Sequence, residues 1–388
     1  MSTKISAEYE VFRDLEHWMP AKDIVSITDI MPEEDKLFGF FAYLYAQTKS
    51  IYAHVAVRKN GEDPFVHPLN VVINLQRAGI TDAITLCAGL MHDYIEEKVD
   101  IYRDSQNILE WGKGIKILDE YEERVFLELE QKLSEFAAKN GVSQRVIKDI
   151  LAILTLLTRH KRDFYYQSII GIFECRDEKI RERAIQVKLA DRTHNILCID
   201  NFTEEQRLFQ CFKNLFILNN VKLYLMKRRG KKLFTGNDAT EKLFKKCGKA
   251  TYDAFLFICY RSLDTGIDQV TSMIQLAFKK FVLEKSGLWE VTRVNQKEKH
   301  PLRLFQGVIR TYDARLHHHW REYESMKRQE LKYCQRFFKD FKFTSPQIQA
   351  IIDYKDAYSL KEVIAYLMYQ PEYTLERFSY KKLFRKGK

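Results

Sequence analysis

Apolar residues recur three and four positions apart along much of this chain, the spacing of helices that bury one face. Between residues 35 and 48 such positions alternate with polar ones, and residues 119–140 carry an apolar stripe opposite a face rich in acids. The chain has only 15 Gly and 7 Pro in 388 residues, so it has few of the tight turns that close hairpins. The pattern predicts an all-α protein.

Capping signals divide this pattern into elements. Pro68 suits the first turn of a helix opened by His67 and ending near residue 77, and Thr81-Asp82 can cap a following helix that carries His92 and Asp93 in its C-terminal half. Residues 142–157 are expected to continue helically after Ser143, another helix is expected over 182–195, and Thr203 with Gln206 resembles a capping box. We therefore expect an N-terminal arm over residues 1–30, a first domain over 31–203 and a second helical domain over 204–388.

Composition narrows the class of protein. Hydrophobic residues make up 46% and charged residues 30% of the chain, which excludes disorder. The seven Cys contain no C-x-x-C pair, so a disulfide framework and a zinc ribbon are both disfavoured and the thiols are expected to be reduced. No run approaches the roughly 18 apolar residues of a membrane helix, which favours a cytoplasmic protein without membrane contact.

Charge is distributed unevenly between the two halves. Residues 1–200 carry a net charge of −7 and residues 201–388 a net charge of +17. A dense basic stretch contributes to this excess: Lys222, Lys227, Arg228, Arg229, Lys231, Lys232, Lys242, Lys245, Lys246 and Lys249. This half could bind nucleic acid or another polyanion, draw anionic nucleotides toward a site, or regulate or dimerise the protein as a homo-oligomer. Solvated amphipathic helices explain the same charges.

Four residues stand out as metal-capable: His67, the adjacent pair His92 and Asp93, and Asp191 within VKLADRTHN. Together they supply two imidazoles and two carboxylates from separate helices, which leaves positions for water and substrate around one ion. Mixed nitrogen and oxygen ligands without Cys favour a divalent ion of intermediate hardness. We expect Mn²⁺, with Mg²⁺, Fe²⁺, Ni²⁺ and Zn²⁺ as alternatives.

The sequence around these residues contains a series of short motifs in a fixed order. It comprises Arg-Lys, Gly-x-x-Pro, His-Pro-Leu, His-Asp-x-x-Glu-Glu and Lys-Leu-Ala-Asp-Arg-x-x-Asn. Over residues 35–200 the chain thereby resembles the HD-domain phosphohydrolases, in particular the hydrolase domain of RelA/SpoT-type enzymes and small alarmone hydrolases. The resemblance implies an all-α bundle in which His67, His92, Asp93 and Asp191 are the metal ligands.

Further roles follow from the same resemblance. Glu96 and Glu97, one helical turn after His92 and Asp93, match the family's acidic pair and would manage protons. Arg58, Lys59 and Asn195 are the corresponding substrate-binding residues. Lys188 and Arg192 flank Asp191 but are expected to point to other faces of its helix, in structural roles.

Three features depart from the family's pattern. The interval between His92 and Asp191 is long, at 99 residues, and the acidic helix at 119–140 fills the extra length, which predicts a reshaped pocket. The stretch LTRHKRDFYYQSI is more typical of other HD phosphohydrolases, and residues after 200 show no recognisable nucleotide-synthetase domain.

These features favour one function and leave two others open. The expected activity is removal of the 3′-pyrophosphate from guanosine tetra- or pentaphosphate, with a nucleotide as the partner. The alternatives are a phosphohydrolase acting on another nucleotide or phosphoester, and a nucleotide-sensing or nucleic-acid-binding protein with the same fold.

Overall fold

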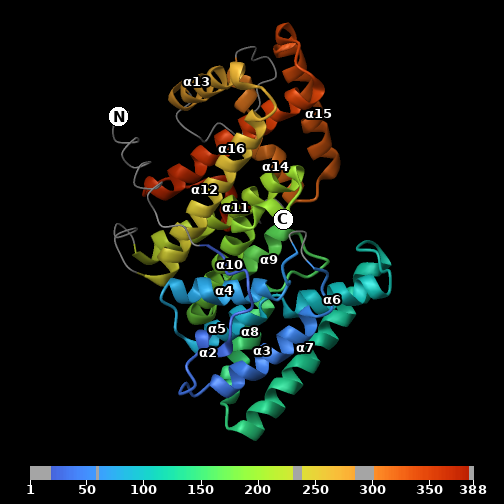
Figure 1. The fold of residues 1–388 in the computed structure, drawn as a ribbon, viewed down its shortest axis with the longest axis vertical. Helices are drawn as coiled ribbons and strands as arrows, with labels where there is room; N and C mark the ends of the chain where they lie inside the picture. Colours follow the sequence, from blue (N-terminus) through green and yellow to red (C-terminus); the bar gives the residue numbers. More distant parts are fainter. Residues whose placement is uncertain (1–18, 58–60, 230–237, 285–300, 384–388) are drawn as a thin grey trace. The chain divides into compact units, whose positions relative to one another are not determined.

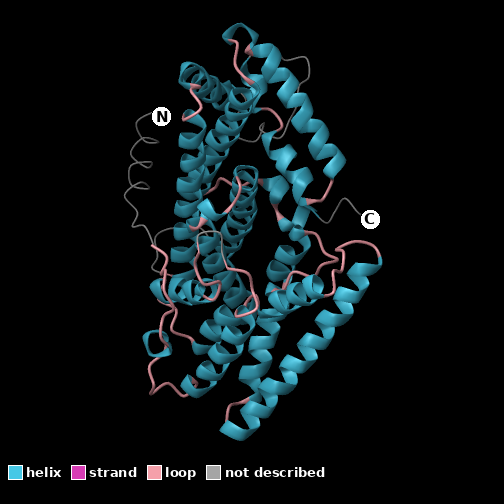
Figure 2. Cartoon of the chain, turned by 45° about the vertical axis from the view of Figure 1, so that its right-hand side comes forward, coloured by secondary structure: helices cyan, strands magenta, loops and turns pink. Residues whose placement is uncertain are grey.

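The computed structural model describes residues 19–57, 61–229, 238–284 and 301–383. Within these ranges the secondary structure is helical and contains no strand, so the all-α prediction is confirmed (Figure 2). The described residues form two compact units. One contains residues 19–57, 61–201 and 238–247, and the other contains residues 202–229, 248–284 and 301–383.

The first unit holds every described residue predicted to bind metal, bind substrate or transfer protons. Its helices, labelled in Figure 1, are α2 (Ile27–Ile30), α3 (Phe38–Tyr52), α4 (Val66–Arg77), α5 (Ala83–Met91), α6 (Tyr94–Ser105), α7 (Lys113–Asn140), α8 (Gln144–Leu157), α9 (Tyr165–Glu174) and α10 (Glu178–Leu197). Helix α10 packs against α4, α5, α8 and α9, and α6 pairs with α7. The centre of the unit is therefore formed by α4, α5, α8 and α10.

Local signals explain where several of these helices begin. Pro68 lies in the first turn of α4, where its missing N–H needs no partner. The Asp82 side chain accepts a hydrogen bond from the N–H of Thr85 at the start of α5, and Ser143 caps α8 in the same way. Helix α7 begins six residues before the predicted position, directly after Gly112, whose positive φ of 59° suits glycine.

The prediction for His92 and Asp93 was wrong in one respect. They do not lie inside a helix, because α5 ends at Met91 and α6 begins at Tyr94. His92 keeps helical angles, whereas Asp93, with φ −102° and ψ 2°, forms the N-cap position of α6. Adjacent residues of a continuous helix point about 100° apart. The break removes that constraint and lets both side chains face one point.

The second unit is built from α11 (Glu204–Arg229), most of α12 (Ala239–Leu263), α13 (Asp268–Glu284), α14 (Val308–Leu316), α15 (Trp320–Phe337), α16 (Ser345–Tyr369) and α17 (Tyr380–Leu383). Thr203 and Gln206 form the predicted capping box before α11. Within the described ranges, no helix is long and apolar enough to span a bilayer.

Part of the basic stretch is not available as a surface. The Lys222 side chain is completely buried, and its ammonium donates to the carbonyl of Gln370. Lys249 is also buried, with its Nζ 2.8 Å from Asp253 Oδ1. Two lysines of the dense basic stretch are therefore buried in the core. Lys231 and Lys232 lie outside the described residues.

Candidate metal centre

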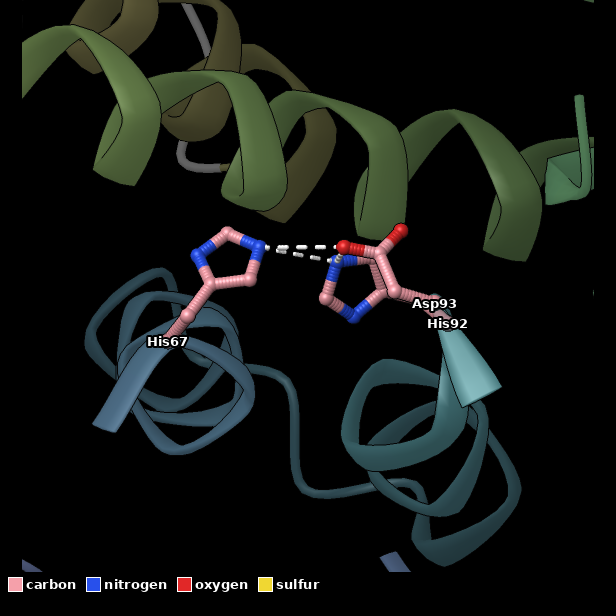
Figure 3. Close-up of side chains that lie close together, drawn as sticks. All are labelled: His67, His92 and Asp93. Carbon is pink, nitrogen blue, oxygen red and sulfur yellow. Dashed lines mark hydrogen bonds and ion pairs between the residues drawn. The ribbon is translucent and has the colours of Figure 1, made fainter. Parts of the chain in front are cut away.

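Three segments bring the predicted ligands together. His67 comes from the first turn of α4, His92 and Asp93 from the α5–α6 break, and Asp191 from the middle of α10. Figure 3 shows the imidazole of His67 pointing toward the side chains of His92 and Asp93, across which α10 runs. His67, His92 and Asp191 are buried, and Asp93 is half-buried. The centre is therefore enclosed by helices and open on the Asp93 side.

The donor atoms of His67, His92 and Asp93 are spaced as ligands of a single ion, and Asp191 lies next to the two imidazoles. His67 Nε2 lies 3.1 Å from His92 Nε2 and 3.3 Å from Asp93 Oδ2, and the last two atoms are 3.0 Å apart. Asp191 Oδ1 lies 3.5 Å from His67 Nε2 and 3.9 Å from His92 Nε2. Bonds of roughly 2.1 Å place ligand atoms about 3.0 Å apart at right angles and about 3.4 Å apart at tetrahedral angles. The donor set fits a divalent cation.

Hydrogen bonds to the outer ring nitrogens orient both imidazoles. His92 Nδ1 lies 2.9 Å from the carbonyl oxygen of Gly89, so this nitrogen carries a proton and Nε2 is the ring atom that faces Asp93 and His67. His67 Nδ1 lies 2.8 Å from Nδ1 of His194, a buried residue of α10 whose Nε2 is 3.6 Å from Cys198 Sγ. The sequence analysis missed His194. Its position three residues after Asp191, on the same helical face, is the signal that could have found it.

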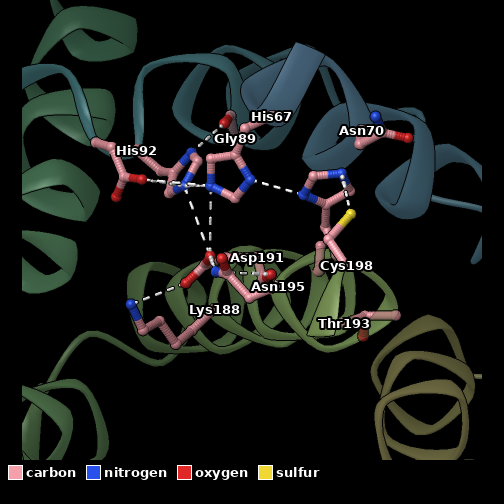
Figure 4. A network of polar contacts seen from close by, with 12 residues as sticks. His67, Asn70, Gly89, His92, Lys188, Asp191, Thr193, Asn195 and Cys198 are labelled. Atoms are coloured by element: carbon pink, nitrogen blue, oxygen red, sulfur yellow. Dashed lines mark hydrogen bonds and ion pairs between the residues drawn. The ribbon is translucent and has the colours of Figure 1, made fainter. Parts of the chain in front are cut away.

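Asp191 is held from two sides, as Figure 4 shows. Lys188 Nζ lies 3.0 Å from Asp191 Oδ2, and the side-chain amide of Asn195 donates to Oδ1. Although burial raises the pKa of the Asp191 carboxyl, the Lys188 ammonium and the His92 imidazole lower it to about 2. The expectation that Lys188 points away from Asp191 was wrong, because residues three apart share a helical face. Asn195, predicted to bind substrate, lies at the site, where its side-chain amide contacts the carboxylate of Asp191.

The electrostatics of the centre favour a cation. Burial lowers the pKa of His92, but the facing Asp93 carboxylate raises it to about 9. The pKa of Asp93 is held well below its usual range by His92 and His67, although burial opposes this. The buried Asp191 and half-buried Asp93 carboxylates thus stabilise positive charge between the imidazoles. A divalent ion would displace the protons of the imidazole nitrogens. The carboxylate oxygens of Asp93 and Asp191 are already deprotonated and need no such exchange.

The two predicted glutamates follow the break, in the first turn of α6. Glu96 Oε1 accepts the backbone N–H of Arg159 at 2.7 Å. Burial and the Asp93 carboxylate raise the pKa of both side chains, that of Glu97 to about 8. Both are half-buried beside the ligand cluster. Arg58 and Lys59, the remaining predicted site residues, lie outside the described residues.

Comparison with known proteins gives two curated relatives. A GTP pyrophosphokinase from Myxococcus xanthus is 26% identical over 189 residues, which are 48% of this chain and 20% of that protein. A protein from Mycoplasma pneumoniae named probable guanosine-3′,5′-bis(diphosphate) 3′-pyrophosphohydrolase is 27% identical over 150 residues, 39% of this chain and 17% of that protein. The aligned segments thus span a fifth or less of either relative's length.

These relatives confirm the predicted resemblance to RelA/SpoT-type enzymes. No protein-family model matches the chain. No solved structure matches it either. The relationship therefore rests on the two partial alignments.

Proposed function

We propose that this protein is a metal-dependent phosphohydrolase of the HD type that removes the 3′-pyrophosphate from guanosine tetra- or pentaphosphate. The observation that carries the proposal is the convergence of His67, His92 and Asp93 with ligand-like spacing, next to Asp191 Oδ1 at 3.5 Å from His67 Nε2. Support comes from the relative whose name describes this hydrolysis. The donor chemistry, two imidazoles and two carboxylates, is best matched by Mn²⁺.

The ligand residues would hold the ion and leave its remaining positions to water and substrate. A bound divalent ion polarises phosphoryl oxygens and lowers the pKa of a nearby water toward neutrality. His194 and the Gly89 carbonyl fix the two imidazoles, while Lys188 and Asn195 fix the carboxylate of Asp191. The site is thus oriented by hydrogen bonds before the substrate arrives.

The two glutamates are suited to opposite proton transfers. With a pKa near 8, Glu97 carries a proton at neutral pH and can donate it to the leaving oxygen. The Arg159 N–H holds Glu96 Oε1 and opposes the rise in its pKa that burial and Asp93 cause, and we assign to Glu96 the proton of the attacking water. Arg58 and Lys59 would bind the phosphates or the base, as in the resembled family.

A substrate panel tests this proposal. The Mn²⁺-loaded protein is incubated with nucleotides that include both guanosine alarmones, and products are resolved by chromatography. Asp93→Ala removes one ligand, and Asp23→Ala, at an exposed position of the same unit, is the matched control. We expect pyrophosphate release by the wild type and the Asp23 variant and none by the Asp93 variant. Cleavage of a different nucleotide would overturn the substrate assignment, and no cleavage by Mn²⁺-loaded protein would overturn the hydrolase.

A further inference from the structure

The loop between α8 and α9 directs four consecutive residues at acids of α6, of α7 and of the segment between them. The backbone N–H of Arg159 donates to Glu96, at the metal centre. The three side chains that follow pair with carboxylates of the long interval: His160 with Glu122, Lys161 with Asp100 and Glu110, and Arg162 with Asp119. A basic loop is thus matched residue by residue to an acidic surface.

Lys161 is the best-anchored of these side chains. Only 4% of it is exposed, whereas 47% of the Arg162 side chain is exposed. Its ammonium donates to Asp100 Oδ1 and lies 3.2 Å from Glu110 Oε1. A buried ammonium is expensive unless it is paired, so its loop is stable only where these two acids receive it. The Lys161 contacts therefore set the position of the loop backbone.

The loop backbone in turn sets the position of Glu96. A glutamate side chain has three rotatable bonds, and the Arg159 N–H fixes one carboxylate oxygen at 2.7 Å. A peptide N–H can do this only if its own peptide plane is held. Lys161 lies two residues after Arg159, and its ion pairs with Asp100 and Glu110 hold the loop against α6 and the segment before α7.

We infer that Lys161 is a positioning residue for the site, which clamps the Arg159–Arg162 loop onto the acidic α6–α7 surface and thereby aims Glu96 at the reacting centre. The effect of this clamp on catalysis rests on the proposed function, whereas its effect on the loop does not. It gives the long interval between the metal ligands a specific role, because both acids that receive Lys161 belong to that interval. The loop is then held in place by the residues of this interval.

Arg103 provides a matched control for Lys161. Its guanidinium also pairs with Asp100, at 2.8 Å, and with Glu110, but it does not belong to the loop. Lys161→Met and Arg103→Met each remove one cation from the same acid cluster and leave the other in place. Only the first releases the loop. Lys161→Arg keeps the charge and tests rescue.

Hydrogen exchange and kinetics on the full-length protein test the clamp. In Lys161→Met, peptides spanning residues 157–165 should exchange about tenfold faster, while peptides of α10 stay unchanged. With alarmone substrate, kcat should fall about tenfold with little change in KM or in bound Mn²⁺, because only the aim of Glu96 is lost. Arg103→Met should match the wild type within about twofold in both measurements, and Lys161→Arg should recover most of kcat.

The outcomes separate the clamp from the proposed function. Unchanged exchange in Lys161→Met, or equal loss of kcat in Arg103→Met, would overturn the clamp. Loss of Mn²⁺ from Lys161→Met would also overturn it, since the residue would then support the ligands rather than Glu96. Faster exchange in a protein whose wild type cleaves no nucleotide would support the clamp and refute the hydrolase.

Discussion

Replacing Lys222 by Met should stabilise the second unit, and more so at low pH. Lys222 lies on α11 with no exposed side-chain surface, and burial lowers its pKa from 10.5 to about 7. Between these two pH values the unfolded chain binds the proton more tightly than the folded chain, so stability rises with pH across this window. Below pH 7 the full penalty is present, because the ammonium must then be buried in its charged form.

The size of the effect follows from the shift. A difference of about 3.5 pKa units corresponds to at most about 5 kcal/mol below pH 7, falling to about 1 kcal/mol at pH 10. Met keeps most of the aliphatic volume of the lysine. The Gln370 carbonyl that accepts the ammonium also accepts the N–H of Tyr373 at 3.0 Å, so it keeps a partner in the variant.

Urea unfolding at pH 6, 8 and 10 measures this prediction. We expect Lys222→Met to gain at least about 2 kcal/mol at pH 6 and to lose most of that gain by pH 10. Lys227→Met, at an exposed position of the same helix, should change the free energy of unfolding by less than about 0.5 kcal/mol. A Lys222→Met variant that is destabilised equally at all three pH values would refute the reasoning, since the ammonium would then be a net stabilising group.

Three further predictions concern the first unit. His194→Phe should weaken Mn²⁺ binding in calorimetry by about 10- to 100-fold, and His194→Asn, which keeps a donor, should recover part of it. Asn195→Ala should reduce Mn²⁺ affinity by about tenfold, more than it raises KM, because Asn195 holds the Asp191 carboxylate. The Glu122 hydrogen bond raises the pKa of His160. The stability that this ion pair contributes is therefore complete below pH 6.5 and is lost as the pH rises through the raised pKa. Glu122→Gln should therefore lower the melting temperature more at pH 6 than at pH 9.

Controls make each of these outcomes decisive. Equal Mn²⁺ affinity in His194→Phe and the wild type would show that the outer imidazole does not orient its neighbour. A raised KM with unchanged Mn²⁺ affinity in Asn195→Ala would return that residue to the substrate-binding role expected from sequence. A pH-independent effect of Glu122→Gln would mean that the buried carboxylate acts without a charged histidine.

Much of the fold could be predicted because its signals are local. The end of α4 at Arg77, the Asp82 cap and the Thr203 capping box each depend on residues within one or two turns. The gathering of His67, His92 and Asp191 was expected only through a resemblance to a known family. Residue spacing alone does not show that helices distant in sequence will meet.

The misses concern contacts that local patterns cannot encode. Lys222 sits in a run of basic residues, yet its burial depends on the segment after α16, more than a hundred residues later. The clamp by Lys161 likewise depends on which acids of α6 and of the segment after it face the loop. The break at His92 has no Gly or Pro to mark it. Charged runs and short helix interruptions are thus interpretable only when their tertiary partners are known.

The placement of His92 and Asp93 at the α5–α6 break puts two of the proposed metal ligands on one short piece of backbone. Two of the four donors therefore move together, whereas His67 and Asp191 each belong to a separate helix. Deleting or inserting one residue at the break would displace both donors at once. A shift of α5 against α6 would move half of the proposed ligand set, so this junction is a point at which a change elsewhere in the chain could tune metal affinity.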